Sequence, residues 1–252
     1  MSIYLAVFAG LLKQKQAVIF DMARHKEVLT QIQRGITSAT VHTSIESYSA
    51  HVILNRFPTF DIPVTGWSMR FSNLQAVLAH LDANQPETII EFGSGASTLL
   101  IASWLRERGK GRLVSIDHDP KWGEHTRQIL ARHGLEQHVQ LIVAPLTARG
   151  DTQGLWYDID VRDHFSNLSF DLVVVDGPPG HLTPDGTTRM PAIPQLEGLL
   201  SDTASVILDD TNRPGEKQIL REWKSQLCDS DPYFVHSPSG AVIIRRRSGL
   251  PA

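Results

Sequence analysis

Short apolar runs alternate with longer amphipathic stretches over the last three quarters of this 252-residue chain. Runs rich in Val, Ile and Leu and bounded by turn residues predict buried strands, whereas apolar residues spaced three or four positions apart predict helices. Strands are predicted at 88–92, 112–117, 139–144, 171–175 and 205–208, and helices at 71–83, 97–108 and 121–133. This alternation favours a doubly wound α/β fold with a mostly parallel sheet and helices on both faces.

The end of the chain follows a different pattern. Two short apolar runs, 233–236 and 241–244, flank the turn residues Ser237-Pro238-Ser239-Gly240. Apolar runs separated by so short a turn predict an antiparallel hairpin.

The N-terminal part begins with an apolar decapeptide, Ile3–Leu12, followed by Lys13 and Lys15 and a second apolar patch at 17–20. Ten residues are too few to span a bilayer. A secretory signal needs a basic region before its apolar core, and Met1-Ser2 carries no side-chain cation.

We therefore expect one long helix through Gln33, ended by Gly35. Its apolar residues would cover the main domain or a second copy of the chain, and peripheral contact with a membrane is the alternative. The mixed stretch at 37–66 predicts an irregular cover. The expected domains are an N-terminal extension at 1–66 and a main domain at 67–252.

Composition limits the possible functions. With 41% hydrophobic and 20% charged residues, the chain is typical of soluble globular proteins. A net charge of −3 gives no basic surface, so we do not expect nucleic acid as a partner. Cys228 is the only cysteine, which excludes an intrachain disulfide and suits a reducing, cytoplasmic location.

The strand at 88–92 ends in an acid and a glycine-rich turn, Glu91-Phe92-Gly93-Ser94-Gly95, directly before a helix. Glycines allow backbone N–H groups to approach a ligand closely, and the helix directs its positive end toward that ligand. The dinucleotide-binding fingerprint requires a third glycine where this chain has Thr98. A nicotinamide or flavin cofactor is therefore disfavoured.

The next strand, 112–117, ends in Asp117, about 20 residues beyond the glycine turn. Doubly wound folds place at this position the carboxylate that accepts the ribose hydroxyls of a nucleotide. Asp119 precedes Pro120 and is better explained as a helix cap. We assign the ribose to Asp117, with His118 beside it.

An acid two residues before a Gly-x-Gly turn, with Ser97 behind it, resembles the first motif of class I S-adenosylmethionine-dependent methyltransferases. The resemblance covers residues 67–246 and implies a seven-stranded sheet with a C-terminal antiparallel hairpin. It also implies that the acid lies near the amino acid part of the cofactor, with the glycines under its amino acid and ribose parts. The cofactor contacts expected on these grounds are Glu91, Gly93, Ser94, Gly95, Ser97, Thr98, Asp117, His118 and Asp176.

Two further strands also end in acids. Asp176 follows the strand at 171–175 and precedes Gly-Pro-Pro-Gly, and Asp209 and Asp210 follow the strand at 205–208. Open α/β sheets bind ligands at the carboxyl ends of their strands. Three carboxylates at one such edge repel each other unless a cation, a donor or a proton intervenes.

This trio resembles the metal site of catechol-type O-methyltransferases, in which an Asp after one strand and an Asp-Asn pair after the next bind a divalent ion. The resemblance implies a magnesium ion held by Asp176, Asp209 and Asp210, whose oxygen ligands suit that ion. The ion would lower the pKa of a substrate hydroxyl. Helix capping by Asp210, or an ion pair between Asp210 and Arg213, are the alternatives.

The enzymes of that type carry a lysine base three residues after the first Asp, where this chain has Pro179. His181, beside the Pro-Pro-Gly turn, is therefore a candidate base together with Asp176. Arg189 is a candidate to hold an acidic or phosphorylated substrate, and Trp67 a candidate substrate contact.

The predicted activity is methyl transfer from S-adenosylmethionine to a hydroxyl of a small molecule or sugar, by in-line displacement. The Asn-Pro-Pro-aromatic tetrad of amino-methylating enzymes does not occur in the sequence. Two alternatives stay open. One is an aminopropyltransferase-like enzyme of the same fold, and the other is a non-catalytic module for cofactor binding or assembly.

Overall fold

The computed structural model describes residues 37–59, 65–148, 154–227 and 231–246, together with residues 27, 29–31, 33 and 35. The chain divides into two compact units, Met1–Ile45 and Glu46–Ala252. The described residues of the first unit are helical, and their side chains are largely exposed.

The helix differs from the prediction at two points. Gly35 is itself helical, so the helix does not end there, and residues 37–56 are helical rather than irregular. Thr43 and Ser44 donate hydrogen bonds from their hydroxyls to the backbone carbonyls four residues earlier, at 2.9 and 3.0 Å. Such bonds satisfy hydroxyl groups within a helix, and one interior glycine costs only about 1 kcal/mol. The Ser/Thr-rich composition was therefore misleading.

The predictions for Ile3–Leu12 and for the patch at 17–20 lie outside the described residues. Among the helices that the structure describes, none has the length and apolar character needed to cross a membrane.

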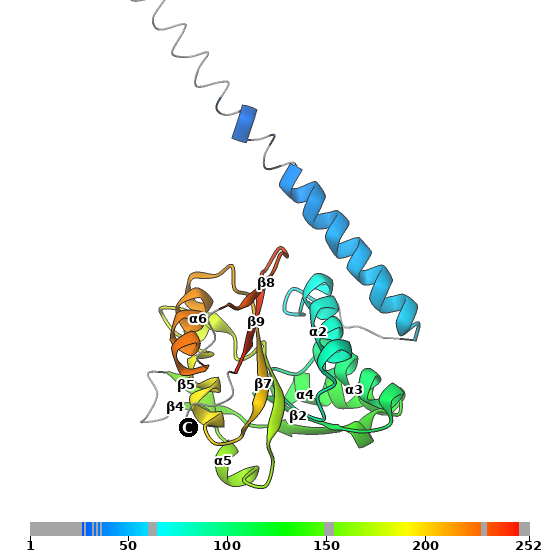
Figure 1. Ribbon diagram of the computed structural model, residues 1–252, viewed down its shortest axis with the longest axis vertical. Coiled ribbons are helices and arrows are strands. Elements are labelled where there is room, and N and C mark those ends of the chain that lie inside the picture. Colours follow the sequence, from blue (N-terminus) through cyan, green and yellow to red (C-terminus); the bar gives the residue numbers. More distant parts are fainter. Residues whose placement is uncertain are drawn as a thin grey trace, which may run out of the picture. The chain divides into compact units, whose positions relative to one another are not determined.

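The second unit is built on a seven-stranded sheet of order β3-β2-β1-β6-β7-β9-β8 (Figure 1). The first five strands of this order are parallel, whereas β9 runs antiparallel to both β7 and β8. This arrangement confirms the predicted fold class and the terminal hairpin. The strands are β1 (Thr88–Phe92), β2 (Arg112–Asp117), β3 (Val139–Val143), β6 (Phe170–Val175), β7 (Leu200–Asp209), β8 (Tyr233–Val235) and β9 (Ala241–Arg245).

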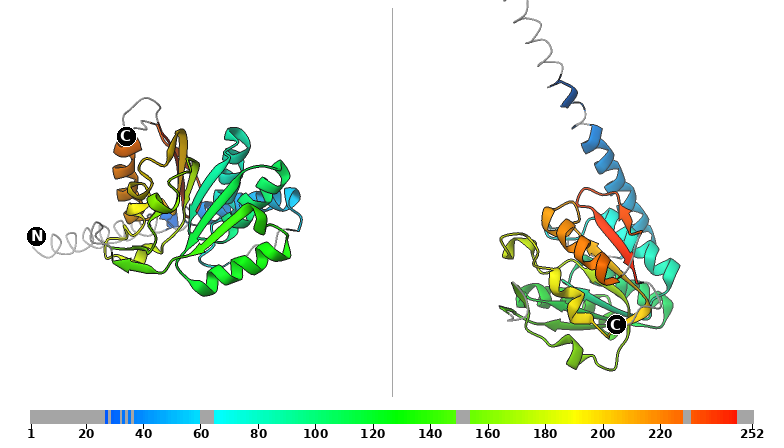
Figure 2. Two further views of the ribbon diagram at one scale, coloured as in Figure 1. Left: turned by 90° about the horizontal axis from the view of Figure 1, so that it is seen from below. Right: turned by 60° about the vertical axis from the view of Figure 1, so that its left-hand side comes forward.

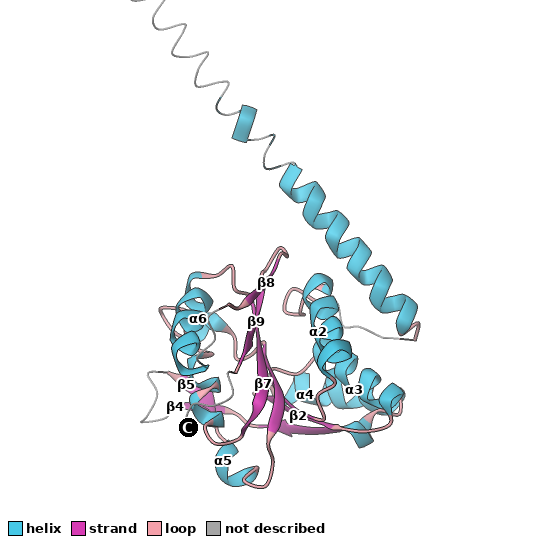
Figure 3. Cartoon of the chain, viewed as in Figure 1, coloured by secondary structure: helices cyan, strands magenta, loops and turns pink. Residues whose placement is uncertain are grey.

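Helices cover both faces of the sheet, with α6 on one side and α2 and α3 on the other (Figures 1 and 3). The α-helices are α2 (Phe71–Asn84), α3 (Ala96–Arg108), α4 (Pro120–Arg132), α5 (Val161–His164) and α6 (Pro214–Leu227). Short 3-10 helices occur at Glu136–His138, Gly180–Leu182, Met190–Ala192 and Pro194–Leu196.

The core has two layers because successive strand residues point to opposite faces. In β1, Ile89 packs with the residues of α2 and α3, whereas Ile90 packs in the cluster that contains Trp223 of α6. Both are fully buried. Parallel strands buried on both faces give continuous apolar runs, and this is the pattern by which the sequence predicted them.

The stretch between β3 and β6, expected to be irregular, contains an antiparallel pair, β4 (Leu146–Ala148) and β5 (Leu155–Tyr157). Trp156 and Tyr157 of β5 are fully buried in the core. At the edge of the seven-stranded sheet opposite β3, the strands β9 and β8 extend it beyond β7 (Figure 2).

Residues before the predicted domain boundary contribute to this unit. Ile53 and Phe57 are buried against α2 and α3. The Glu46 carboxylate accepts hydrogen bonds from the backbone N–H groups of Phe71 and Ser72, at 3.0 and 3.2 Å. Since the first N–H groups of a helix have no partner within it, Glu46 caps α2.

Candidate active site

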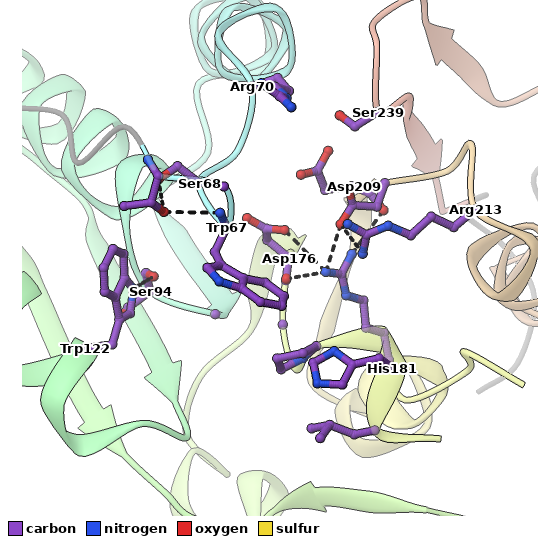
Figure 4. Close-up of a pocket in the computed structure, with 18 of the residues that line it drawn as sticks. Trp67, Ser68, Arg70, Ser94, Trp122, Asp176, His181, Asp209, Arg213 and Ser239 are labelled. Atoms are coloured by element: carbon purple, nitrogen blue, oxygen red, sulfur yellow. Dashed lines mark hydrogen bonds and ion pairs between the residues drawn. The ribbon is translucent and has the colours of Figure 1, made fainter. Parts of the chain in front are cut away.

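A cavity of about 830 Å³ lies where the carboxyl ends of β1, β2, β6 and β7 meet. The segment at residues 65–70 and the turn between β8 and β9 complete its walls (Figure 4). Cavities of a few hundred to a thousand cubic ångströms are typical of small-molecule sites. Of the predicted site residues, the wall includes Trp67, Gly93, Ser94, Asp117, His118, Asp176, His181, Arg189, Asp209 and Asp210.

The glycine turn after β1 touches the turn after β6. Gly93 has a φ of +95°, and a Cβ placed there would lie 2.7 Å from the backbone nitrogen of Gly177. The N–H groups of Asp176 and Gly177 both donate to the carbonyl of Phe92, at 2.9 and 2.7 Å. Glycine at position 93 therefore allows the ends of β1 and β6 to approach closely. It also leaves the backbone of the turn accessible to a ligand.

The acid of the first motif lies beneath the turn. Glu91 is fully buried, and its Oε2 accepts hydrogen bonds from Thr98 Oγ1 at 2.5 Å and Ser115 Oγ at 2.7 Å. Thr98 Oγ1 in turn accepts from the Gly95 N–H at 2.8 Å. Thr98, in place of a third glycine, thus couples the turn to the buried acid.

Burial raises the pKa of Glu91 from its ordinary 4.5 to about 7, although hydrogen bonds from Ser97, Thr98 and Ser115 act in the opposite direction. Gly95, Ser97 and Thr98 lie outside the cavity wall together with Glu91. Their direct contact with a cofactor stays a prediction.

Asp117, at the end of β2, forms part of the cavity wall and is 3% exposed. Its Oδ2 accepts hydrogen bonds from Ser94 N at 2.7 Å and Ser94 Oγ at 2.9 Å, and its Oδ1 accepts from Asp119 N at 2.9 Å. Burial acts to raise the pKa of Asp117, but hydrogen bonds from His118, Asp119 and Ser94 outweigh it and lower the pKa. Asp117 therefore presents an ionised carboxylate to the cavity.

Trp122 is a wall residue that the sequence reasoning missed. Its indole Nε1 donates to the Ser94 carbonyl at 2.5 Å, and its ring lies against Gly95. The sequence contained a signal for its position, because the helix cap predicted at Asp119 is found in the structure. Asp119 accepts from Lys121 N and Trp122 N, and Pro120 begins α4. This cap places Trp122 in the first turn of α4, next to the end of β2.

At the other end of the cavity, carboxylate oxygens of Asp176, Asp209 and Asp210 all lie within 4.8 Å of one another. The predicted convergence of three acids from two strand ends is therefore found in the structure. Oxygen donors at this spacing fit a hard divalent cation such as magnesium.

Arg189 is a buried cation inside this acidic cluster, 2% exposed. Its Nη2 lies 3.1 Å from Asp210 Oδ2 and 3.4 Å from Asp176 Oδ1, and its Nη1 lies 3.7 Å from Glu216 Oε1. It also donates to the backbone carbonyls of Asp176, Pro178 and Asp209, at 2.5, 3.1 and 3.2 Å. Every nitrogen of the guanidinium group thus contacts protein oxygens, and Arg189 links the ends of β6 and β7.

Burial is the main influence on the acids of this cluster. It raises the pKa of Asp176 well above its ordinary value, and the neighbouring Asp209 raises it further while Arg189 lowers it. Burial and Asp210 raise the pKa of Asp209 to about 6, again against Arg189. The pKa of Glu216 is raised by burial as well. The cluster therefore attracts protons or cations.

Asn73, in the first turn of α2, is a second residue that the sequence reasoning missed. It is 1% exposed, and its Nδ2 donates to Asp209 Oδ1, to Ser239 Oγ at 2.9 Å and to the Gly240 carbonyl at 3.3 Å. Because the carboxylate and the carbonyl are both acceptors, the amide nitrogen must face them. The sequence alone does not distinguish Asn73 from an asparagine that only caps a helix, because its hydrogen-bond partners lie more than 130 positions away.

Trp67 is 72% exposed, yet it forms part of the cavity wall, and its ring lies 5.8 Å from that of His181 (Figure 4). Arg70 and Ser239 line the opposite part of the wall. The structure thus brings Trp67 and His181 together next to Asp176.

The chain has relatives among methyltransferases. Residues 90–211 match a family model described as a methyltransferase domain. Over 175 residues the chain is 28% identical to catechol O-methyltransferase B of Danio rerio. The match covers 67% of this chain and 60% of that relative, so it spans less than two thirds of the relative's length.

Solved structures share the fold. A methyltransferase of Podospora anserina, solved with S-adenosylhomocysteine bound, superimposes with a TM-score of 0.53 at 17% identity, over 82% of this chain and 88% of that one. An O-methyltransferase of Bacillus cereus in complex with the same product gives a TM-score of 0.53 at 14% identity, over 81% and 91% of the two chains. At these identities the likeness concerns the fold.

The family match covers the segment that contains the glycine turn, Asp117, Asp176, Asp209 and Asp210. The strand order and the terminal antiparallel pair agree with the fold that this resemblance implies. Residues 90–211 therefore resemble the methyltransferase domain of that family model, and the second unit has the fold of the solved methyltransferases.

Proposed function

We propose that this protein transfers the methyl group of S-adenosylmethionine to a hydroxyl group of a small molecule. The observation that carries the proposal is that one cavity contains both a surface suited to the cofactor and a surface suited to the acceptor. One end has the glycine turn and the ionised Asp117, which suit the ribose and amino acid parts of the cofactor. The other has the acids at the ends of β6 and β7, which suit a hydroxyl that must lose a proton.

The cavity fits the cofactor chemically. Gly93 has no side chain, so the backbone of the turn stays open to the cavity. Asp117 lines the cavity with an ionised carboxylate, and a carboxylate is an acceptor that suits ribose hydroxyls. The volume of about 830 Å³ leaves room for a second small molecule.

In the proposed reaction, the acceptor oxygen attacks the methyl carbon in line with the departing sulfur while the site holds both reactants in contact. Asp176 is the candidate to accept the hydroxyl proton, because burial and its acidic neighbours raise its pKa. His181, which lines the same cavity, is the second candidate. Trp67 would contact the acceptor.

A magnesium ion fits the oxygen donors of Asp176, Asp209 and Asp210, and would supply stabilisation of the deprotonated acceptor oxygen. Arg189 is buried among protein oxygens, so we assign it to positioning the acids rather than to holding the substrate.

Calorimetric titration with S-adenosylmethionine and S-adenosylhomocysteine tests the cofactor half. We expect saturable binding of both, and absence of binding to the wild-type protein would contradict the proposal. Incubation with S-adenosylmethionine and a panel of phenols, catechols and sugars, followed by mass spectrometry of S-adenosylhomocysteine, tests the acceptor class. Product formed only with amine acceptors would exclude an oxygen acceptor, and repetition with EDTA or added magnesium tests the ion.

A further inference from the structure

The described wall of the cavity contains three arginines, Arg70, Arg189 and Arg213, which differ in what they bind. Arg189 is buried among carboxylates and backbone carbonyls. Arg213 is half exposed, and its Nη1 lies 2.8 Å from Asp210 Oδ2. Arg70 is exposed, and within the part of the chain that the structure describes its side chain makes no ion pair or hydrogen bond. Of these three arginines, only Arg70 has a guanidinium group that is free to bind a ligand.

The backbone at Arg70 is held in place on both sides. Before it, residues 65–68 form a turn in which the Thr65 N–H donates to Ser68 Oγ at 3.0 Å and the Trp67 N–H donates to Thr65 Oγ1 at 3.2 Å. After it, the Glu46 carboxylate caps the first turn of α2. Only the side chain of Arg70 has to be ordered when a ligand binds, which keeps the entropic cost of binding low.

Arg70 lies close to the acids that end β6 and β7. It directly precedes α2 and stands three positions before Asn73, which donates to the carboxylate of Asp209 and to Ser239 Oγ. Three residues of a helix rise by about 5 Å. Figure 4 shows Arg70 and Ser239 at the end of the view opposite to His181. A small molecule can therefore reach the acids and Arg70 at the same time.

A negative group on the acceptor has one favourable place in this part of the described wall. The carboxylates of Asp176, Asp209 and Asp210 repel it. Arg189 is enclosed by protein oxygens, and Arg213 is paired with Asp210. Such a group therefore turns toward Arg70, and this orients the rest of the molecule toward the acids.

The charge at Arg70 fits a carboxylate. One guanidinium group balances the single charge of a carboxylate and donates two parallel hydrogen bonds to its oxygens. A phosphate group carries nearly two charges, so about half of its charge would stay unbalanced beside the acids.

We propose that the methyl acceptor is a hydroxy acid, and that Arg70 binds its carboxylate while its hydroxyl lies at the acids that end β6 and β7. This inference rests on the proposed function, because it names the class of acceptor for the same cavity. It gives to Arg70 the role that the sequence suggested for Arg189.

Calorimetric titration of matched compounds into the protein saturated with S-adenosylhomocysteine tests this inference without turnover. Gallate and pyrogallol differ by one carboxylate on an aromatic ring, and glucuronate and glucose differ by one carboxylate on a sugar. We expect the acid of at least one pair to bind at least about 10-fold more tightly than its neutral partner, because hydrogen bonds between charged groups are strong. The pair that shows this preference distinguishes an aromatic acid from a sugar acid. Equal binding within both pairs, or binding of none of the four compounds, would overturn the proposal.

Arg70→Gln and Arg213→Gln form the matched comparison, because each removes one guanidinium group from the same wall. Arg70→Gln should reduce the preference for the acid to within about twofold, because the charged hydrogen bonds are lost. Arg213→Gln should retain most of it, and Arg70→Lys should retain part of it, because lysine keeps the charge but not the paired donors. Equal losses in the two Gln variants would show that the overall charge of the wall attracts the acid, and would overturn the proposal.

S-adenosylhomocysteine binding and thermal unfolding, measured on each variant, report whether it is folded. A wild-type protein that binds S-adenosylhomocysteine without preferring either acid would overturn this inference and leave the proposed methyltransferase function intact. Absence of S-adenosylhomocysteine binding would contradict the proposed function instead. The same pairs, titrated into the protein alone, would then still measure the preference for a carboxylate.

Discussion

The two ends of the cavity both contain buried acids, but they stabilise them by different means. At the cofactor end, Glu91 and Asp117 accept hydrogen bonds from hydroxyl and backbone N–H groups no more than 24 positions away in the sequence. At the acidic end, Asp176, Asp209 and Asp210 depend on Arg189 and on Asn73, which is 136 positions from Asp209. Neutral donors build the first end, and a buried cation and a distant amide build the second.

This difference explains why the cofactor end is visible in the sequence. A turn and the strand that follows it supply donors and acceptors together, so their spacing carries the information. A cation that arrives from a separate loop leaves no spacing pattern. The comparison also predicts which substitutions should matter most.

The largest effect is expected at the acidic end. Arg189→Gln should lower the free energy of unfolding by about 3–5 kcal/mol, because it leaves several buried carboxylates without their cation. Arg213→Gln is the matched control. Because the Arg213 side chain is 50% exposed, this substitution should lower the free energy of unfolding by less than about 1 kcal/mol. Urea denaturation followed by circular dichroism measures both. Similar small losses would show that the buried cation is not needed for stability.

The contact between the two ends can be broken at Gly93. Gly93→Ala should cost about 3 kcal/mol, because the new methyl group adds a clash with the Gly177 backbone to an unfavourable positive φ. Gly109→Ala is the control, since Gly109 has a φ of +71° but no atom within 4 Å of the added Cβ. It should cost only about 1–2 kcal/mol. Equal costs in urea denaturation would refute a role for the close approach.

At the cofactor end, Asp117→Ala should weaken S-adenosylhomocysteine binding roughly 30-fold, or about 2 kcal/mol, because it removes a charged acceptor from the cavity wall. Calorimetry measures the affinity, and Glu124→Gln on the exposed surface of α4 is the control. Undiminished binding in the Asp117 variant would show that the ribose assignment is wrong.

The last effect, of a size similar to that at Asp117, depends on pH. The folded-state pKa of Glu91 is about 7, above its ordinary 4.5, so the folded protein binds more protons than the unfolded chain between these values and loses stability as pH rises through them. The Glu91→Gln variant has no ionisable group at this position, so its stability does not fall with pH for this reason. The stability of the variant relative to the wild type should therefore be about 2 kcal/mol greater at pH 8 than at pH 5.5. A difference that is independent of pH would contradict the raised pKa.

Sequence reasoning failed at the N-terminal helix for a local reason, and at the cavity because residues of separate elements meet there. Gly35 and the Ser/Thr-rich residues after it predicted the end of a helix, yet the backbone carbonyls of the helix itself accept the hydroxyls of Thr43 and Ser44. Arg189 was predicted as a candidate to hold an acidic or phosphorylated substrate, and its burial among acids could not be foreseen from its place on a loop. Trp122 could have been found from the cap at Asp119, whereas Asn73 could not.

The sequence by itself determined the sheet, the glycine turn and the acids at the ends of four strands, because apolar periodicity and residues adjacent to a strand end are local properties. Only the tertiary structure decided how those acids are stabilised. Burial of Glu91 under the turn, contact of Gly93 with Gly177, and enclosure of Arg189 by acids from two strand ends and a helix all depend on how separate elements pack in space. Electrostatic interactions depend on those distances and on burial, and neither is recorded in the spacing of residues.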